Sequence, residues 1–150
     1  MKCYHCDECL SDAVIDYSMN AHNAPLCIEG QRLMDHLNKD GSNSKEQLLL
    51  FLRLKHLGAN PILNKKDAYK TVDIAIEDIG LHLEIDGTHH NWKATQAYSD
   101  LQRTIHDLEI GITTIRIPNS LVWHNFTKCT DQLIRFIEKK RGFHQYDFGS

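Results

Sequence analysis

The spacing of apolar and polar residues along the chain predicts helices and strands in alternation. The segment from Ser44 to Gly58 has a broad apolar face; its first residue can cap a helix and its last can end one. Apolar and polar residues alternate over Val72 to Ile76 and over Leu81 to Asp86, as in half-buried strands. Ile62 to Asn64 gives a weaker strand signal.

The second half of the chain adds two helices and a strand. Ala94 to Ile110 has helical periodicity, and Thr127 to Arg141 is amphipathic. Between them, Ile112 to Ile117 is a short apolar run that Pro118 closes, which predicts a buried strand. The apolar residues on one face of the first helix are Ala97, Leu101, Ile105 and Leu108. This order predicts an α/β fold with a central mixed, largely antiparallel sheet flanked by helices.

The first residues of the chain differ in composition from the rest. They are rich in Cys, His and Asn and lack sustained periodicity, and a turn-rich linker follows over Asn38 to Ser44. A chain of 150 residues has room for one hydrophobic core and a small appendage. We therefore predict a Cys/His-rich module over residues 1–37, a core over 44–141 and a tail over 142–150.

The cysteines indicate metal binding rather than disulfides, because four of the five lie within the first 27 residues. The residues with zinc-finger spacing are Cys6, Cys9, His22 and Cys27. Cys3 and His5 compete with His22 for the fourth position. The segment also resembles small zinc ribbons that end in Leu-Cys-x-x-Cys, with Gly30 in place of the last cysteine. We expect a structural Zn²⁺, against the alternative of free cysteines that pack locally.

Charge and hydropathy narrow the cellular setting. No segment is long and apolar enough to span a membrane, and the amino end lacks a secretory signal, so we expect a cytoplasmic protein without a membrane partner. The net charge of −3 excludes a polycationic protein that binds any phosphate backbone through its overall charge. Nucleic-acid binding would depend on a metal ion and on local basic clusters at Lys65 to Lys70 and Lys139 to Arg141.

Two of the predicted strands carry clustered acids. The connection Glu77 to Gly80 is short enough to force an antiparallel hairpin, and pairing of Ile76 with Leu81 places Asp73 opposite Glu84. Asp86 falls on the same face as both, and we call these three acids the acidic centre. Opposed like charges favour a bound cation, and carboxylate oxygens suit Mg²⁺ or Mn²⁺. The alternative is a solvated polar face of an ordinary hairpin.

A family resemblance extends this interpretation over Ser44 to Glu138. The residues that carry it are Val72-Asp73-Ile74, Leu83-Glu84-Ile85-Asp86-Gly87-Thr88-His89-His90, Asp100-Leu101-Gln102-Arg103, Leu108, Gly111 and Ile115-Arg116-Ile117. In order and spacing they resemble the PD-(D/E)XK nucleases, the restriction-endonuclease-like proteins grouped near the very-short-patch repair endonucleases. The resemblance implies a restriction-endonuclease-like core and a Mg²⁺-dependent endonuclease that hydrolyses DNA.

The resemblance also implies roles for residues at the acidic centre. Asp73 and Glu84 would coordinate the metal. Asp86 stands where the family often has a lysine, which leaves the general base open: Asp86 could bind a second metal ion, or His89 or His90 could carry protons.

Further site residues come from the predicted helices over Ser44 to Gly58 and over Ala94 to Ile110. Glu46 would approach the metal from the former. Asp100 and Arg103 would orient the site or hold phosphate, whereas the alternative for this pair is an ordinary surface ion pair.

We therefore expect a metal-dependent endonuclease whose partner is DNA, and such enzymes often act as homodimers. The main alternative is a catalytically inactive nuclease fold that serves as a nucleic-acid-binding or adaptor protein. A third possibility is another metal-dependent phosphoesterase with a convergent motif.

Overall fold

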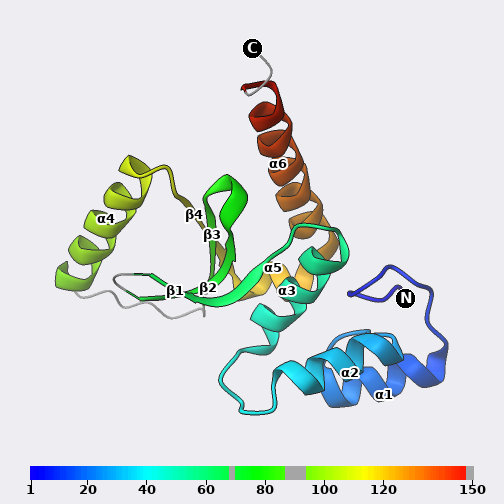
Figure 1. Ribbon diagram of the computed structural model, residues 1–150. Helices are drawn as coiled ribbons and strands as arrows, with labels where there is room; N and C mark the ends of the chain where they lie inside the picture. The colour runs from blue at the N-terminus through cyan, green and yellow to red at the C-terminus, as the bar shows by residue number, and fades with distance from the viewer. Residues whose placement is uncertain (68–69, 87–93, 148–150) are drawn as a thin grey trace.

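The computed structural model describes residues 1–67, 70–86 and 94–147 of the chain (Figure 1). In chain order its elements are α1 (Asp12–His22), α2 (Ile28–Leu37), α3 (Lys45–His56), β1 (Ile62–Lys66), β2 (Thr71–Ile76), η1 (Glu77–Ile79), β3 (Leu81–Asp86), α4 (Ala94–Glu109), β4 (Thr113–Pro118), α5 (Asn119–His124) and α6 (Phe126–Asp147).

The strands form one sheet in the order β1-β2-β3-β4, with helices around it. The first three strands are antiparallel and β4 runs parallel to β3, which confirms the predicted mixed, largely antiparallel sheet. Ile76 pairs with Leu81, as the short hairpin connection predicted. Gly80 makes this turn with a φ of 61°, and a Cβ there would lie 2.4 Å from the Gly111 carbonyl oxygen, so only glycine fits.

Helix α3 forms the centre of the hydrophobic core. Ser44 caps it as predicted, because its side chain accepts a hydrogen bond of 3.1 Å from the Gln47 backbone N–H. The helix is buried on nearly all sides because it lies between the sheet and the α1–α2 pair and also contacts α5 and α6 (Figure 1). Its buried apolar residues are Leu48, Leu49, Leu50, Phe51, Leu52 and Leu54.

The amino-terminal segment consists of a small hairpin and two helices, not of the paired strands of a zinc ribbon. An isolated bridge between Lys2 and Cys9 closes a small hairpin, and the helices α1 and α2 follow it. Side chains cap both helices, Ser11 at α1 and Cys27 at α2. Apolar residues of this segment, including Leu26 and Met34, belong to the same buried cluster as the α3 leucines. The segment therefore shares one core with the rest of the chain.

Helix α4 connects β3 to β4 and begins and ends close to the predicted positions. The apolar residues predicted on one face, Leu101, Ile105 and Leu108, are exposed. The polar side of the helix instead bonds to the sheet, through ion pairs of Asp100 and Arg103 that fix its orientation.

Helix α6 is longer than predicted, because residues 142–147, assigned to a tail, continue it. Among the helices that the structure describes, none combines the length and the hydrophobicity needed to cross a membrane.

Candidate functional site

The hairpin of β2 and β3 brings Asp73 and Glu84 together. Its observed register, Ile74 with Leu83 and Ile76 with Leu81, extends to place Asp73 beside Glu84. The Asp73 carboxylate reaches across to β3 and accepts a hydrogen bond of 2.9 Å from the Ile85 backbone N–H at Oδ2. One oxygen of this carboxylate is thus fixed by the neighbouring strand.

The backbone of β2 is held at the same point from the opposite side. The buried side chain of Gln47 donates from Nε2 to the Asp73 carbonyl oxygen at 3.0 Å and to Asn64 Oδ1 at 2.9 Å. Asn64 interrupts the regular backbone of β1 with a φ of 53°, between residues that pair with Ile74 and Val72. Asp73 is therefore anchored by α3 and β1 as well as by β3.

Glu84 lies among cationic side chains. Lys70 Nζ forms an ion pair with Glu84 Oε1, Arg103 Nη2 lies 3.2 Å from the same oxygen, and Arg116 Nε lies 3.8 Å from Oε2. The Glu84 side chain is only 12% exposed. The alternative of a solvated polar face therefore does not fit Glu84, because its side chain is largely buried among cations.

Asp100 completes the arrangement from α4. It accepts a hydrogen bond of 3.1 Å from Arg103 and forms an ion pair with Arg116, so Asp100 and Glu84 share two arginines. Burial raises the pKa of Asp100, but the hydrogen bond from Arg116 and the charges of Arg116, Arg103 and Lys70 outweigh burial and lower it. The predicted pair of Asp100 and Arg103 thus belongs to the site rather than to an isolated surface bridge.

The pKa of Asp73 is shifted in the opposite direction to that of Asp100. Burial is the largest cause that raises its pKa, and the negative charges of Glu84 and Asp86 raise it further, against the Ile85 N–H and the charge of Lys70. Asp86 is half-buried at the end of β3, beside Pro118 of β4. The Asp73 carboxylate is therefore a place where additional positive charge is stabilising.

Sequence patterns do not place Lys70 or Arg116 at the site. Arg116 lies in the apolar strand pattern Ile115-Arg116-Ile117, and Lys70 belongs to a basic cluster. Both reach Glu84 through tertiary structure: the parallel register pairs Arg116 with Glu84, and Lys70 immediately precedes β2. The parallel strand after the Asp-x-x-Arg helix was the available signal for Arg116.

Of the other predicted site residues, the structure describes Glu46. Glu46 accepts a hydrogen bond of 2.9 Å from Trp123 Nε1, which ties α3 to α5. His89 and His90 lie outside the described residues. Among the residues that the structure describes, the acidic centre is not gathered into a set whose ligand atoms all lie within 4.8 Å of one another. Glu84 is directed at its basic partners instead.

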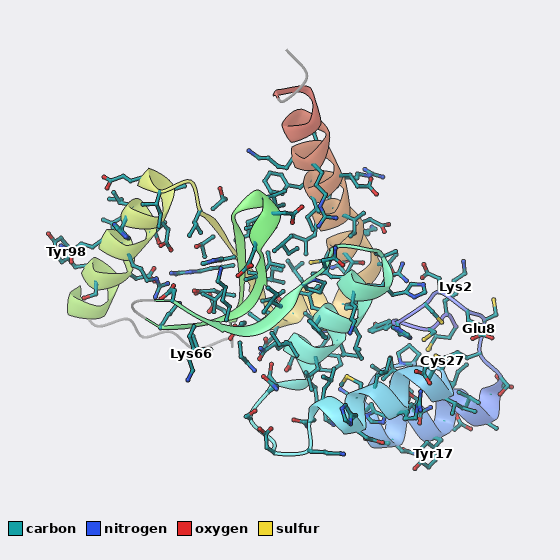
Figure 2. All side chains as sticks on the ribbon, viewed as in Figure 1. Lys2, Glu8, Tyr17, Cys27, Lys66 and Tyr98 are labelled. Carbon is teal, nitrogen blue, oxygen red and sulfur yellow. The ribbon has the colours of Figure 1, made fainter. Side chains whose placement is uncertain are left out.

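One group of potential metal ligands at the amino-terminal hairpin does meet this distance limit. The ligand atoms that lie within 4.8 Å of one another belong to Cys3, His5, Cys6 and Cys27, which we call the Cys/His cluster. Such a cluster could hold a metal ion such as zinc. In Figure 2 yellow sulfur atoms gather where the amino-terminal segment meets the start of α2 near Cys27.

The cluster retains two of the four ligands predicted from spacing, Cys6 and Cys27. Cys9 is exposed at the end of the hairpin, and His22 is buried at the end of α1, with Nε2 3.8 Å from Asp35. Cys3, considered as an alternative, and His5, a competitor for the fourth position, take their places. The hairpin causes this exchange because it folds Cys3 back toward Cys27.

Burial changes the acidity of three members of the cluster. It raises the pKa of the Cys6 thiol. Burial raises the pKa of the Cys27 thiol to about 11, with the Gly30 N–H opposing this and the neighbouring Cys3 adding to it. Burial, and then the charge of His56, lower the pKa of His5. A neutral imidazole with a free ring nitrogen is the form that binds metals.

No family model, curated protein or solved structure matches this chain. Its function is therefore inferred from its own residues and their arrangement.

Proposed function

We propose that the protein is a divalent-metal-dependent nuclease that hydrolyses phosphodiester bonds in DNA, with Asp73 and Glu84 at its centre. The observation that carries the proposal is the position of these two carboxylates on adjacent strands, next to three cationic side chains. Carboxylates that hold a metal ion and cations that hold the phosphate are the two parts that metal-dependent phosphodiester hydrolysis uses. The resemblance of the surrounding motifs to PD-(D/E)XK nucleases supports the same chemistry.

The acidic centre suits a divalent cation on electrostatic grounds. Asp73 is partly buried near two other carboxylates, and its pKa is raised because burial, and after it the charges of Glu84 and Asp86, disfavour the ionised form. A cation there would offset this penalty, with Asp73 and Glu84 as ligands and Asp86 as a further one. When bound, Mg²⁺ or Mn²⁺ would polarise the scissile phosphate and lower the pKa of a coordinated water.

The basic side chains around Glu84 would serve the substrate. Lys70, Arg103 and Arg116 now neutralise Glu84, and a DNA phosphate carries the same charge as this carboxylate. Guanidinium groups bind phosphate oxygens in a planar, two-pronged geometry. Asp100 holds both arginines and so would keep their donors oriented. In this proposal His89 and His90 stay candidates for proton transfer.

One observation favours the alternative of a non-catalytic nucleic-acid-binding or adaptor protein. Glu84 already has three cationic partners, so it would have to exchange at least one of them to bind a metal ion. A protein that uses this network only for stability would gain no thermal stability from Mg²⁺ or Mn²⁺. A rise in Tm with either ion that is lost in Asp73→Asn would favour the nuclease.

The direct test is cleavage of supercoiled plasmid and of single- and double-stranded oligonucleotides, both DNA and RNA. Metal dependence is best tested by adding Mg²⁺ or Mn²⁺ to metal-depleted buffer, because a strong chelator would also remove a metal ion bound to the Cys/His cluster. The variants are Asp73→Asn and Glu84→Gln, with Glu138→Gln, an exposed acid of α6, as the matched control. Cleavage in the parent and the control alone supports the proposal; no cleavage of any substrate, or cleavage that survives both variants, contradicts it.

A further inference from the structure

The Cys/His cluster has the spacing of a metal centre rather than of a disulfide. Cys6 Sγ lies 3.9 Å from Cys27 Sγ, and Cys27 Sγ lies 3.9 Å from His5 Nδ1. A disulfide would place two sulfurs about 2.05 Å apart. A tetrahedral ion with Zn–S bonds of about 2.3 Å places them about 3.8 Å apart. We propose that the Cys/His cluster binds Zn²⁺ in a closed, structural site that fastens the amino-terminal hairpin to α2.

Backbone N–H groups donate hydrogen bonds to two of the cluster sulfurs. The Cys27 and His5 backbone N–H groups donate to Cys3 Sγ at 3.1 and 3.3 Å, and the Gly30 N–H donates to Cys27 Sγ at 3.3 Å. The sulfurs are acceptors in each of these bonds, as thiolate ligands of metals are. Cys27 is also the N-cap of α2, where the helix dipole favours negative charge.

The fourth ligand lies close to Gly30. A zinc ribbon that ends in Cys-x-x-Cys would have its last cysteine at this position. A Cβ at Gly30 would lie 3.2 Å from His5 Cβ, tighter than an ordinary van der Waals contact, so a side chain there would crowd the histidine. The set of three sulfurs and one imidazole nitrogen is the donor type that tetrahedral zinc prefers.

The site is closed and part of the core. The protein supplies four donors, and Cys3 and Cys27 are buried, which leaves no position for a substrate. The hairpin that carries three of the ligands also contacts the body of the fold. Arg53 of α3 forms an ion pair with Asp7, and Tyr4 stacks on Phe126 of α6 with ring centroids 4.3 Å apart. Zinc would therefore hold in place a hairpin that packs on α3 and α6.

Cobalt substitution of the full chain tests the ligand set. We expect one tightly bound Co²⁺ per chain with the visible bands of a tetrahedral site and sulfur-to-cobalt charge transfer, which a carboxylate site does not give. Cys6→Ser should weaken metal binding by at least about tenfold, since even outer-shell changes have effects of this size. Cys9→Ser, in the same hairpin but exposed, is the matched control and should bind as the parent does.

Alkylation of the parent protein gives a readout that does not depend on whether a variant folds. In the zinc-loaded protein iodoacetamide should label Cys9 first, and the cluster cysteines should react only after a chelator is added. The proposal is overturned if the chain binds no zinc, if Cys9→Ser weakens binding as much as Cys6→Ser, or if zinc leaves the alkylation of the cluster cysteines unchanged. None of these readouts depends on DNA cleavage.

Discussion

Gln47 and Asp73 are joined by a hydrogen bond of 3.0 Å, from the glutamine Nε2 to the aspartate carbonyl oxygen. This bond connects the first turn of α3 to the strand that carries the acidic centre. Arg53, six residues further along the same helix and about 9 Å along its axis, contacts the amino-terminal hairpin through Asp7. Helix α3 is therefore the element that positions both the acidic centre and the Cys/His cluster.

The Gln47 bond should contribute measurably to stability. Gln47→Ala would remove this donor from the Asp73 carbonyl and from the exposed Asn64 side chain in a partly buried setting, and the loss of such hydrogen bonds costs about 1 kcal/mol. We expect a corresponding fall in the free energy of unfolding measured with urea. Gln102→Ala, an exposed change on α4, is the control and should have little effect. Equal effects of the two changes would contradict the anchoring role.

The exchange of ligands at Gly30 can be reversed by design. His5→Gly should weaken zinc binding, and it removes the Cβ that would lie 3.2 Å from a Cβ at position 30, so a cysteine there has room to supply a thiol. We therefore expect the double variant His5→Gly/Gly30→Cys to regain metal affinity with stronger sulfur-to-cobalt charge transfer. Gly30→Ala in the His5→Gly background is the control. Restoration by alanine as well as by cysteine would mean that position 30 does not supply a ligand.

The ion pairs of Asp100 predict a pH-dependent contribution to stability. Its pKa is lower in the folded protein than its usual value of 3.8, so its contribution is present above that value and is lost as the pH falls through the folded pKa. Asp100→Asn should lower the free energy of unfolding by about 1–2 kcal/mol at pH 7. The difference from the parent should shrink below about pH 4.

Urea unfolding of parent and variant at pH 7 and pH 3 measures this difference. Loss of zinc in acid affects both proteins and cancels in the comparison. Asp131→Asn, an exposed change on α6, controls for the general effect of removing a negative charge. A difference that stays constant between the two pH values would refute the assigned ion pairs.

Lys70 should contribute to DNA binding without sequence preference. If it contacts a phosphate, Lys70→Met should weaken binding of all DNA sequences alike and reduce the slope of log K against log salt by about 1. Fluorescence anisotropy over a range of salt concentrations measures both. Lys39→Met, an exposed change in the linker before α3, should leave the slope as it is. An unchanged slope in Lys70→Met would remove this residue from the DNA contact.

The local features of the fold could be predicted because they depend on neighbouring residues. The short turn at Gly80 determines the register of Ile76 with Leu81, and Ser44 caps α3 through its own third neighbour. Both follow from spacing alone. The mixed sheet follows in the same way, because a helix long enough to cross over separates the last two strands.

The two sites could not be predicted fully from sequence spacing, because tertiary contacts bring their residues together. Cys9 and His22 have zinc-finger spacing, yet the hairpin delivers Cys3 and His5 to Cys27 instead. Periodicity did not reveal that α4 faces the sheet with charged residues, because an amphipathic stripe normally indicates a buried face. Gly30 was a local signal, since it stands where a zinc ribbon has its last cysteine and so required a ligand from elsewhere in the chain.

The rate of DNA cleavage under single-turnover conditions tests the central claim most directly. The zinc-loaded parent, Asp73→Asn and Glu138→Gln would be compared on one substrate with Mg²⁺ as the only added metal. Loss of a metal ligand should raise the barrier by about 4 kcal/mol, roughly a thousandfold in rate, while the control cuts like the parent. A parent that binds DNA but does not cut it, or an Asp73→Asn variant that cuts at the parental rate, would contradict a nuclease centred on Asp73 and Glu84.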